Sequence, residues 1–108
     1  MTVYELSKTD GFSAVTVSDG TRKIEGAYCG DLLSWVMGRA QSGNAWITIM
    51  SNMNILAVAS LADVSCIVIA EGVSLESDII KTAEAKKINI LSTTFGEYET
   101  AVKLGSLI

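Results

Sequence analysis

Histidine and proline are both missing from this sequence of 108 residues. Without histidine the chain lacks the commonest general base, the usual ligand for transition metals and the side chain that titrates near neutral pH. Catalysis would have to rely on carboxylates, lysine or cysteine, and no pattern of these residues is typical of an active site. We therefore expect a protein that is not an enzyme and that needs no cofactor and no metal ion.

Cysteine is almost as scarce, because only Cys29 and Cys66 are present. Their spacing fits neither a metal knuckle nor a redox C-x-x-C motif, and we expect reduced thiols in a cytoplasmic protein. Cys29 has no histidine or nearby lysine to activate it as a nucleophile, and Asp31 would repel a thiolate. Cys66 lies in a strongly apolar segment and is expected in the core.

Basic residues are few and dispersed. The chain has eight lysines and arginines against twelve acidic residues, which gives a net charge of −4. A protein that binds nucleic acid needs a clustered basic face, so we expect no nucleic-acid partner. No apolar run approaches the roughly 20 residues that span a bilayer, and we expect a protein that is neither exported nor inserted in a membrane.

Hydrophobic residues, by contrast, make up 49% of the sequence, and charged residues only 19%. A chain of this length can bury a continuous core, so residues 1–108 are expected to form a single domain. Part of the apolar surplus is expected to cover a partner subunit in a homo-oligomer, most simply a dimer. Trp35 and Trp46 are the candidate interface residues, with packing in the core as an equally open alternative.

The first thirty residues are mostly polar and contain several glycines. We predict one short strand at Phe12–Val17, a turn at Asp19–Gly20 and a second strand at Arg22–Tyr28. Together they would form a short antiparallel N-terminal edge or flap.

From Asp31 onward, helical patterns alternate with short apolar runs. Helices are predicted over 31–43, 54–62, 74–87 and from 94 onward, and strands over 45–50, 64–70 and 88–91. Residues 55–62 read as a strand in an alternative interpretation, but two parallel strands need a crossover between them, which favours the helix. The predicted fold class is α/β, a single three-layer-like domain with a mostly parallel sheet flanked by helices.

Four side chains are predicted to begin helices. Asp31, Ser74 and Thr94 stand where N-caps belong, Thr94 forming a T-x-x-E capping box, and one of the asparagines at 52 and 54 could cap the helix that follows. Gly43 is expected to end the first main helix, and a Glu99–Lys103 pair to stabilise the last one.

Ligands of open α/β sheets usually bind outside the carboxyl ends of the strands. Three polar junctions fall there, at 48–54, 70–74 and 92–94. Our candidate ligand-binding residues are Tyr28, Asn52, Asn54 and Ser92, with helix capping as the alternative explanation for both asparagines and with packing as the alternative for Tyr28.

The segments Gly30–Ala40, Ala45–Ile49, Cys66–Gly72 and Ile88–Ser92 together resemble the DRTGG domain family. Residues 64–104 are also similar to the N-terminal, non-catalytic domain of HPr kinase/phosphorylase, and the phosphate-binding loop of the catalytic half has no counterpart here. The string D-R-T-G-G itself is absent, and Asp19–Arg22 provides only an aspartate and an arginine. The resemblance implies an α/β domain that associates into dimers or larger assemblies and acts in regulation, in some settings beside an adenine nucleotide.

The resemblance and the absent active site lead to one functional prediction. We expect a regulatory or ligand-sensing module that binds a small anionic effector, such as an adenine nucleotide, at the strand-end loops of a homodimer. The alternative is a structural interaction subunit that binds a partner enzyme without a small ligand.

Overall fold

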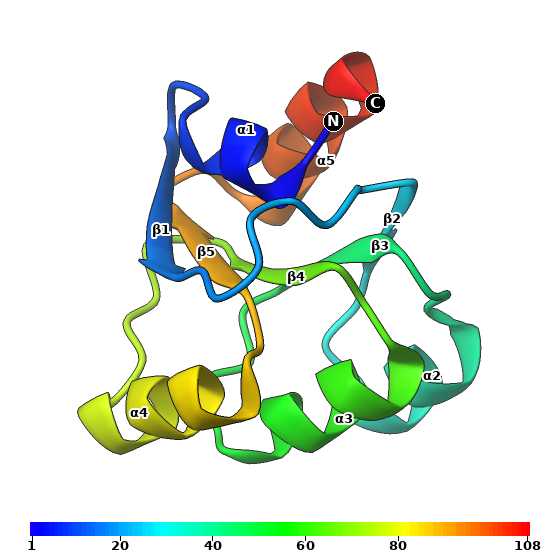
Figure 1. Ribbon diagram of the computed structural model, residues 1–108. Helices are drawn as coiled ribbons and strands as arrows, with labels where there is room; N and C mark the ends of the chain where they lie inside the picture. Colours follow the sequence, from blue (N-terminus) through cyan, green and yellow to red (C-terminus); the bar gives the residue numbers. More distant parts are fainter.

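The computed structural model describes all 108 residues, which form one five-stranded sheet with helices on both faces (Figure 1). In chain order the elements are α1 (Val3–Ser7), β1 (Phe12–Thr16), β2 (Gly26–Cys29), α2 (Leu33–Arg39), β3 (Asn44–Thr48), α3 (Asn54–Ala62), β4 (Cys66–Ile69), α4 (Ser77–Lys86), β5 (Ile90–Thr93) and α5 (Glu97–Leu107). The strand order is β1-β5-β4-β3-β2, with β1 antiparallel to β5 and all other pairs parallel. The predicted single α/β domain with a mostly parallel sheet and an antiparallel N-terminal edge is confirmed.

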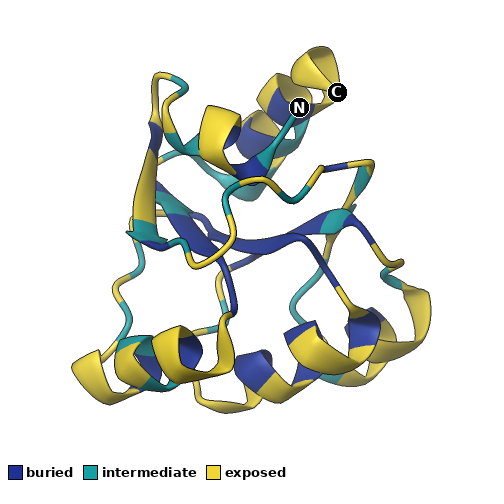
Figure 2. Ribbon diagram, in the orientation of Figure 1, coloured by how far each residue is buried: buried dark blue, intermediate teal, exposed yellow.

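Two apolar layers hold the helices against the sheet. In Figure 1, α1 and α5 lie on the upper face and α2, α3 and α4 on the lower one. Ile47 and Leu91 point into the upper layer with α1 and α5, whereas Trp46, Ile67 and Ile90 point into the lower layer. Because β3 and β4 are covered on both faces, their sequences are apolar without alternation, and Figure 2 shows them as the buried centre of the molecule.

Helix α3 settles the ambiguous segment 55–62 in favour of a helix. It buries Ile55, Leu56, Val58, Ala59 and Ala62 on the face turned to the sheet. The helix ends at Asp63, whose φ of 57° places it in the left-handed conformation. A crossover of this kind is what allows β3 and β4 to run parallel.

The predicted N-terminal hairpin is wrong. Strand β1 pairs with β5, and β2 pairs with β3 at the opposite edge of the sheet. The backbone of 20–24 instead hydrogen-bonds to the first residues of the chain, with Val3 N–H donating to Arg22 O and Ile24 N–H to Met1 O. The connection from β1 to β2 therefore crosses the whole sheet at the amino ends of the parallel strands.

Helix α1 was not predicted, although its capping box is visible in the sequence. The Thr2 hydroxyl accepts from Glu5 N–H at 3.1 Å, and the Glu5 carboxylate accepts from Thr2 N–H at 2.8 Å. Val3 and Leu6 are the buried residues of this short helix, and both join the core under α5. With only two apolar positions the helical period was too short to detect.

Three of the predicted N-caps are wrong. The N-caps are Leu32 for α2, Glu76 for α4 and Gly96 for α5, and none of them makes a side-chain capping hydrogen bond. Asp31 is engaged elsewhere: its Oδ1 accepts from the Thr48 hydroxyl at 2.7 Å and from Ile49 N–H at 2.9 Å, which ties the end of β2 to the end of β3.

Two further helix-end predictions also fail. Helix α2 ends at Arg39 with Ala40 as its C-cap, so Gly43 lies in the turn before β3 with a φ of 85°. The Lys103 ammonium lies 4.9 Å from the centre of the Phe95 ring and forms no ion pair with Glu99. The one salt bridge in the structure joins Arg22 and Asp63.

Side chains at the amino ends of the strands are joined in a hydrogen-bonded network. The buried Asn89 amide accepts from Ser18 N–H and Asp19 N–H, and it donates to Asp19 O and Ser65 O. Arg22 pairs with Asp63 at 2.9 Å. These bonds hold the long β1–β2 connection against the sheet.

Candidate functional site

The three polar junctions predicted to form a site follow β3, β4 and β5, so they share the carboxyl edge of the sheet. Two of them, after β4 and β5, meet the beginning of β1 around one pocket of about 520 Å³. Its lining is Gly11, Phe12, Ser13, Val15, Ile69, Gly72, Val73, Ser74, Leu75, Ser92, Thr93 and Thr94. A volume of this size lies within the range of small-molecule sites.

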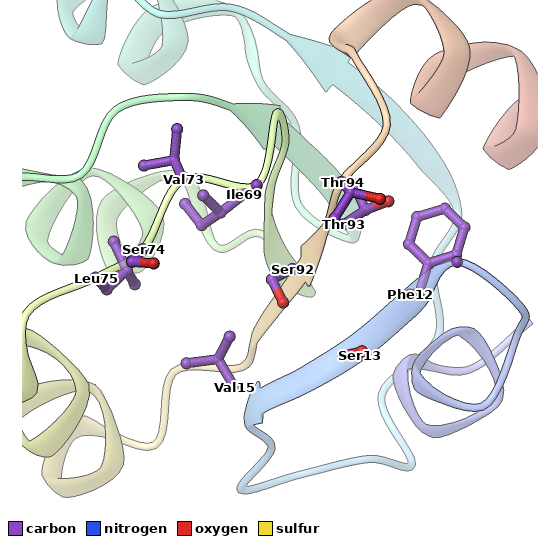
Figure 3. A pocket seen from close by; sticks show the side chains of 12 residues that line it. Phe12, Ser13, Val15, Ile69, Val73, Ser74, Leu75, Ser92, Thr93 and Thr94 are labelled. Atoms are coloured by element: carbon purple, nitrogen blue, oxygen red, sulfur yellow. The ribbon is translucent and has the colours of Figure 1, made fainter.

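The floor of the pocket is a row of residues across three strands. Ser13 on β1 lies opposite Ser92 on β5, which in turn pairs with Ile69 on β4. Val15, two residues after Ser13, packs against the core on the same face of the sheet as Ile69. Figure 3 shows the Ser92 hydroxyl in the middle of the hollow, with Val15, Ile69 and Val73 around it.

The segment from Gly72 to Leu75, which follows Glu71, forms a wall of the pocket and leads into α4. Its position is fixed by the backbone, because Glu71 N–H donates to Phe95 O at 2.8 Å and Gly72 N–H donates to Thr93 O at 2.9 Å. Both residues have positive φ, 61° for Glu71 and 67° for Gly72. A non-glycine residue in this conformation is uncommon, and here it turns the chain out of β4 and over the end of β5.

Hydroxyl groups of the pocket are largely without partners in the protein. The Thr93 hydroxyl accepts from Phe95 N–H at 3.2 Å, whereas those of Ser13, Ser74, Ser92 and Thr94 make no hydrogen bond to another protein group. Ser74 and Thr94, which were predicted to cap helices, are exposed at the rim instead. The arrangement offers free donors and acceptors beside an apolar surface.

Of the four candidate ligand-binding residues, only Ser92 lines this pocket. Tyr28 lies on β2, three strands away from β5, and packs half-buried against the core. Asn52 accepts a hydrogen bond from Asn54 N–H at 2.9 Å where α3 begins, and both asparagines are exposed. The structure therefore does not bring the four residues together.

The two tryptophans have different surroundings. Trp46 is 0% exposed and donates from its indole N–H to Gly30 O at 2.9 Å, so it belongs to the core and offers no surface to a partner. Trp35 on α2 is 53% exposed, with Arg39 stacked 3.8 Å from the ring centre. Only Trp35 remains available as an interface residue.

The Glu97 carboxylate interacts with two other acidic side chains, Asp31 and Glu71, at the carboxyl edge of the sheet. Burial raises the pKa of Glu97 to about 6, and the negative charges of Asp31 and Glu71 add to the effect. One oxygen of Glu97 is buried without a hydrogen-bond partner. No group of three or more histidine, cysteine or acidic side chains is placed to hold a metal ion.

Neither cysteine is activated. Burial raises the pKa of Cys29, and the charges of Glu97 and Asp31 raise it further. Burial also raises the pKa of Cys66, to about 12, in the centre of β4. A thiolate nucleophile is disfavoured at both positions.

The β1 residues of the pocket were missed because the sequence analysis paired β1 with β2 instead of β5. A hairpin with β2 would have carried Ser13 away from the ends of β4 and β5, whereas pairing with β5 places it opposite Ser92. Alternation within β1 was a usable signal, since Ser13 and Val15 had to share one face of the sheet.

Comparison with known proteins agrees with this architecture. In a crystal structure of the CBS and DRTGG domains from the regulatory region of a Clostridium perfringens pyrophosphatase, complexed with its activator diadenosine tetraphosphate, a similar fold occurs with a TM-score of 0.65. The two chains are 17% identical, and the match covers 86% of this chain and 40% of that one. No curated protein matches the sequence. No helix has the length and apolar character needed to cross a membrane.

The DRTGG domain model matches residues 27–107, from β2 to the end of α5. This stretch contains the parallel strands, both strand-end junctions of the pocket and four of the helices, while β1 lies before it. The chain therefore belongs to the DRTGG domain family.

Proposed function

We propose that this chain is a non-catalytic regulatory module that binds an adenine nucleotide in the pocket at the carboxyl ends of β4 and β5. The observation that carries the proposal is the set of four unpartnered hydroxyls grouped around a hollow of about 520 Å³. Ligands of α/β sheets commonly bind at this edge. The activator of the similar regulatory region, which contains two adenosine units, supports an adenine compound as the first ligand to test.

A non-catalytic role is supported by the chemistry of the side chains. The chain has no histidine, both thiols have raised pKa values, and the pocket is lined without an acid, a base or a nucleophilic pair. Binding without turnover is the function that such a lining supports.

Calorimetric titration of the full chain with AMP tests the proposal. We expect binding in the millimolar range or tighter, and an at least tenfold loss in Ser92→Leu, whose larger side chain would occupy the hollow. Ser51→Leu is the matched control, because Ser51 is exposed at the same edge but does not line the pocket. Absence of heat together with an unchanged melting temperature at millimolar AMP would refute nucleotide binding.

A second candidate function is association through α2, either with another copy of the chain or with a partner enzyme. The observation that favours it is a group of large exposed apolar residues on and just before this helix, Leu32, Trp35 and Met37. Sedimentation velocity of the wild type and Trp35→Ala distinguishes the two partners. A dimer that dissociates in the variant supports self-association, and a wild-type monomer favours a partner enzyme.

A further inference from the structure

The pocket at the ends of β4 and β5 contains no charged side chain among its twelve lining residues. Proteins hold phosphate groups with arginine, with lysine or with helix N-termini free of competing acids. The side chains of the lining provide hydroxyls, aliphatic groups and the Phe12 ring. The pocket lining therefore suits an uncharged part of a ligand better than a phosphate group.

The charges next to the pocket are negative. Asp10, Glu71 and Glu76 are the charged residues that directly adjoin the lining segments in sequence, and all three are exposed. Helix α4 begins beside the pocket, but its N-cap is Glu76 and its first turn contains Asp78. These carboxylates would repel a polyphosphate at the start of α4, and Glu97 and Glu99 stand in the first turn of α5, which begins shortly after Thr94.

The hollow suits a flat ring with a polar edge. Ser13 and Ser92 face each other across adjacent strands, and each hydroxyl can both donate and accept a hydrogen bond. Val15, Ile69 and Val73 provide apolar surface beside them. Ring nitrogens and ribose hydroxyls are uncharged groups that such serines recognise.

A group of three cations lines a hollow at the other end of the strands. Arg22, Lys86 and Lys87 line a smaller hollow of about 240 Å³ at the amino edge, together with Asp19 and Asp63. Arg22 is already paired with Asp63. A ligand held by its phosphates would therefore use this amino-edge hollow and not the pocket that contains Ser92.

We infer that the pocket recognises an uncharged purine nucleoside, and that the phosphates of a bound nucleotide remain in solvent without a stabilising contact. The inference rests on the proposed function, since it specifies which half of the nucleotide is bound. Affinity should then be independent of phosphate number or decrease with it, because each added phosphate increases repulsion from the acidic rim.

The test compares adenosine, AMP and ATP by calorimetry on the full chain, without divalent cations, at low and at physiological ionic strength. We expect adenosine to bind at least as tightly as ATP, and added salt to tighten ATP binding by up to about tenfold while leaving adenosine unchanged, since salt screens like charges. Ser92→Leu should weaken adenosine at least tenfold. The Lys86→Gln, Lys87→Gln double variant should leave all three affinities within twofold.

Two other outcomes are informative. ATP binding tenfold tighter than adenosine, weakened by salt or by the double lysine variant, would overturn the inference and leave nucleotide binding by the protein intact. If none of the three ligands binds to a chain whose melting curve is cooperative, the proposed function fails, and the inference fails with it.

Discussion

The two ends of the sheet use their polar side chains in opposite ways. At the amino ends of the parallel strands, Asn89 makes four hydrogen bonds and Arg22 and Asp63 form an ion pair. At the carboxyl ends, four pocket hydroxyls have no partner, and one Glu97 oxygen is buried without one. The difference teaches that the amino end is held together by a hydrogen-bonded network, while the carboxyl end leaves the pocket hydroxyls without partners in the protein.

Loss of the Asn89 side chain should have the largest effect. Asn89→Ala leaves two N–H groups and one carbonyl of the β1–β2 connection, and the carbonyl of Ser65, without their partner, and we expect the free energy of unfolding to decrease by about 3 kcal/mol. Urea denaturation of the variant and the wild type measures this change in the free energy of unfolding. Asn54→Ala is the control, because that exposed side chain makes no hydrogen bond and should change stability by less than about 0.5 kcal/mol. A loss below about 1 kcal/mol in Asn89→Ala would contradict the structural role of the amino end.

The Gly11→Ala variant tests whether the backbone at the carboxyl end of the sheet tolerates a larger residue. Gly11 has a φ of 93°, and a Cβ there would lie 2.3 Å from the Phe95 ring. We expect a loss of about 2 kcal/mol from strain and displacement of the ring, seen as a lower urea midpoint. Gly38→Ala in α2 meets no atom within 4 Å and should instead gain about 1 kcal/mol. Equal effects at both glycines would show that the close approach to Phe95 is unimportant.

Glu97→Gln should stabilise the protein at neutral pH. The folded-state pKa of about 6 lies above the ordinary value of 4.5, so the folded protein holds this proton more tightly than the unfolded chain. Stability from this group is complete below about pH 4.5 and is lost as the pH rises through 6.

The Glu97→Gln variant should not lose stability as the pH rises through 6, so its free energy of unfolding at pH 7 should be higher than that of the wild type. We expect a gain below about 1 kcal/mol, because solvent screens a side chain that is only partly buried. Urea midpoints at pH 4.5, 6 and 7.5 measure the effect, with Glu84→Gln as the control for loss of one negative charge. A lower midpoint for Glu97→Gln at pH 7.5 would mean that the carboxylate is satisfied after all.

Ser92→Ala should have the smallest effect on stability. Since the hydroxyl makes no hydrogen bond within the protein, its loss should change the free energy of unfolding by less than about 0.5 kcal/mol, measured by the same denaturation. Nucleotide affinity should nevertheless decrease severalfold, which separates binding from folding at this position. A stability loss near 2 kcal/mol would place Ser92 among the structural side chains and remove the contrast between the two ends.

Local patterns predicted the central elements well. Helices α3 and α4 and strands β3 and β4 were located to within a few residues, because their apolar residues repeat with a helical period or run without interruption. The acidic start and basic end of α4 also appear in the structure, at Asp78 and Lys86. A mostly parallel sheet followed from the alternation of these elements.

The candidate site stays a prediction. The sequence placed it at the carboxyl edge of the sheet, where every parallel strand ends and where the pocket lies, and of the four candidate residues only Ser92 lines that pocket. Serine and threonine near a helix start have the same sequence signature whether they cap the helix or line a pocket. Ser74 and Thr94 were therefore assigned to caps, although Glu76 and Gly96 occupy those positions.

By itself the sequence determined the α/β class, the order of the helices and central strands, and the absence of histidine chemistry, because composition and periodicity are local properties. Only the tertiary structure decided that β1 and β2 lie at opposite edges, that Trp46 is core and Trp35 is surface, and that Ser13 faces Ser92. Each of these depends on pairing between segments far apart in the chain. Short strands carry too little information to select their partners, so the selection is made by the whole core.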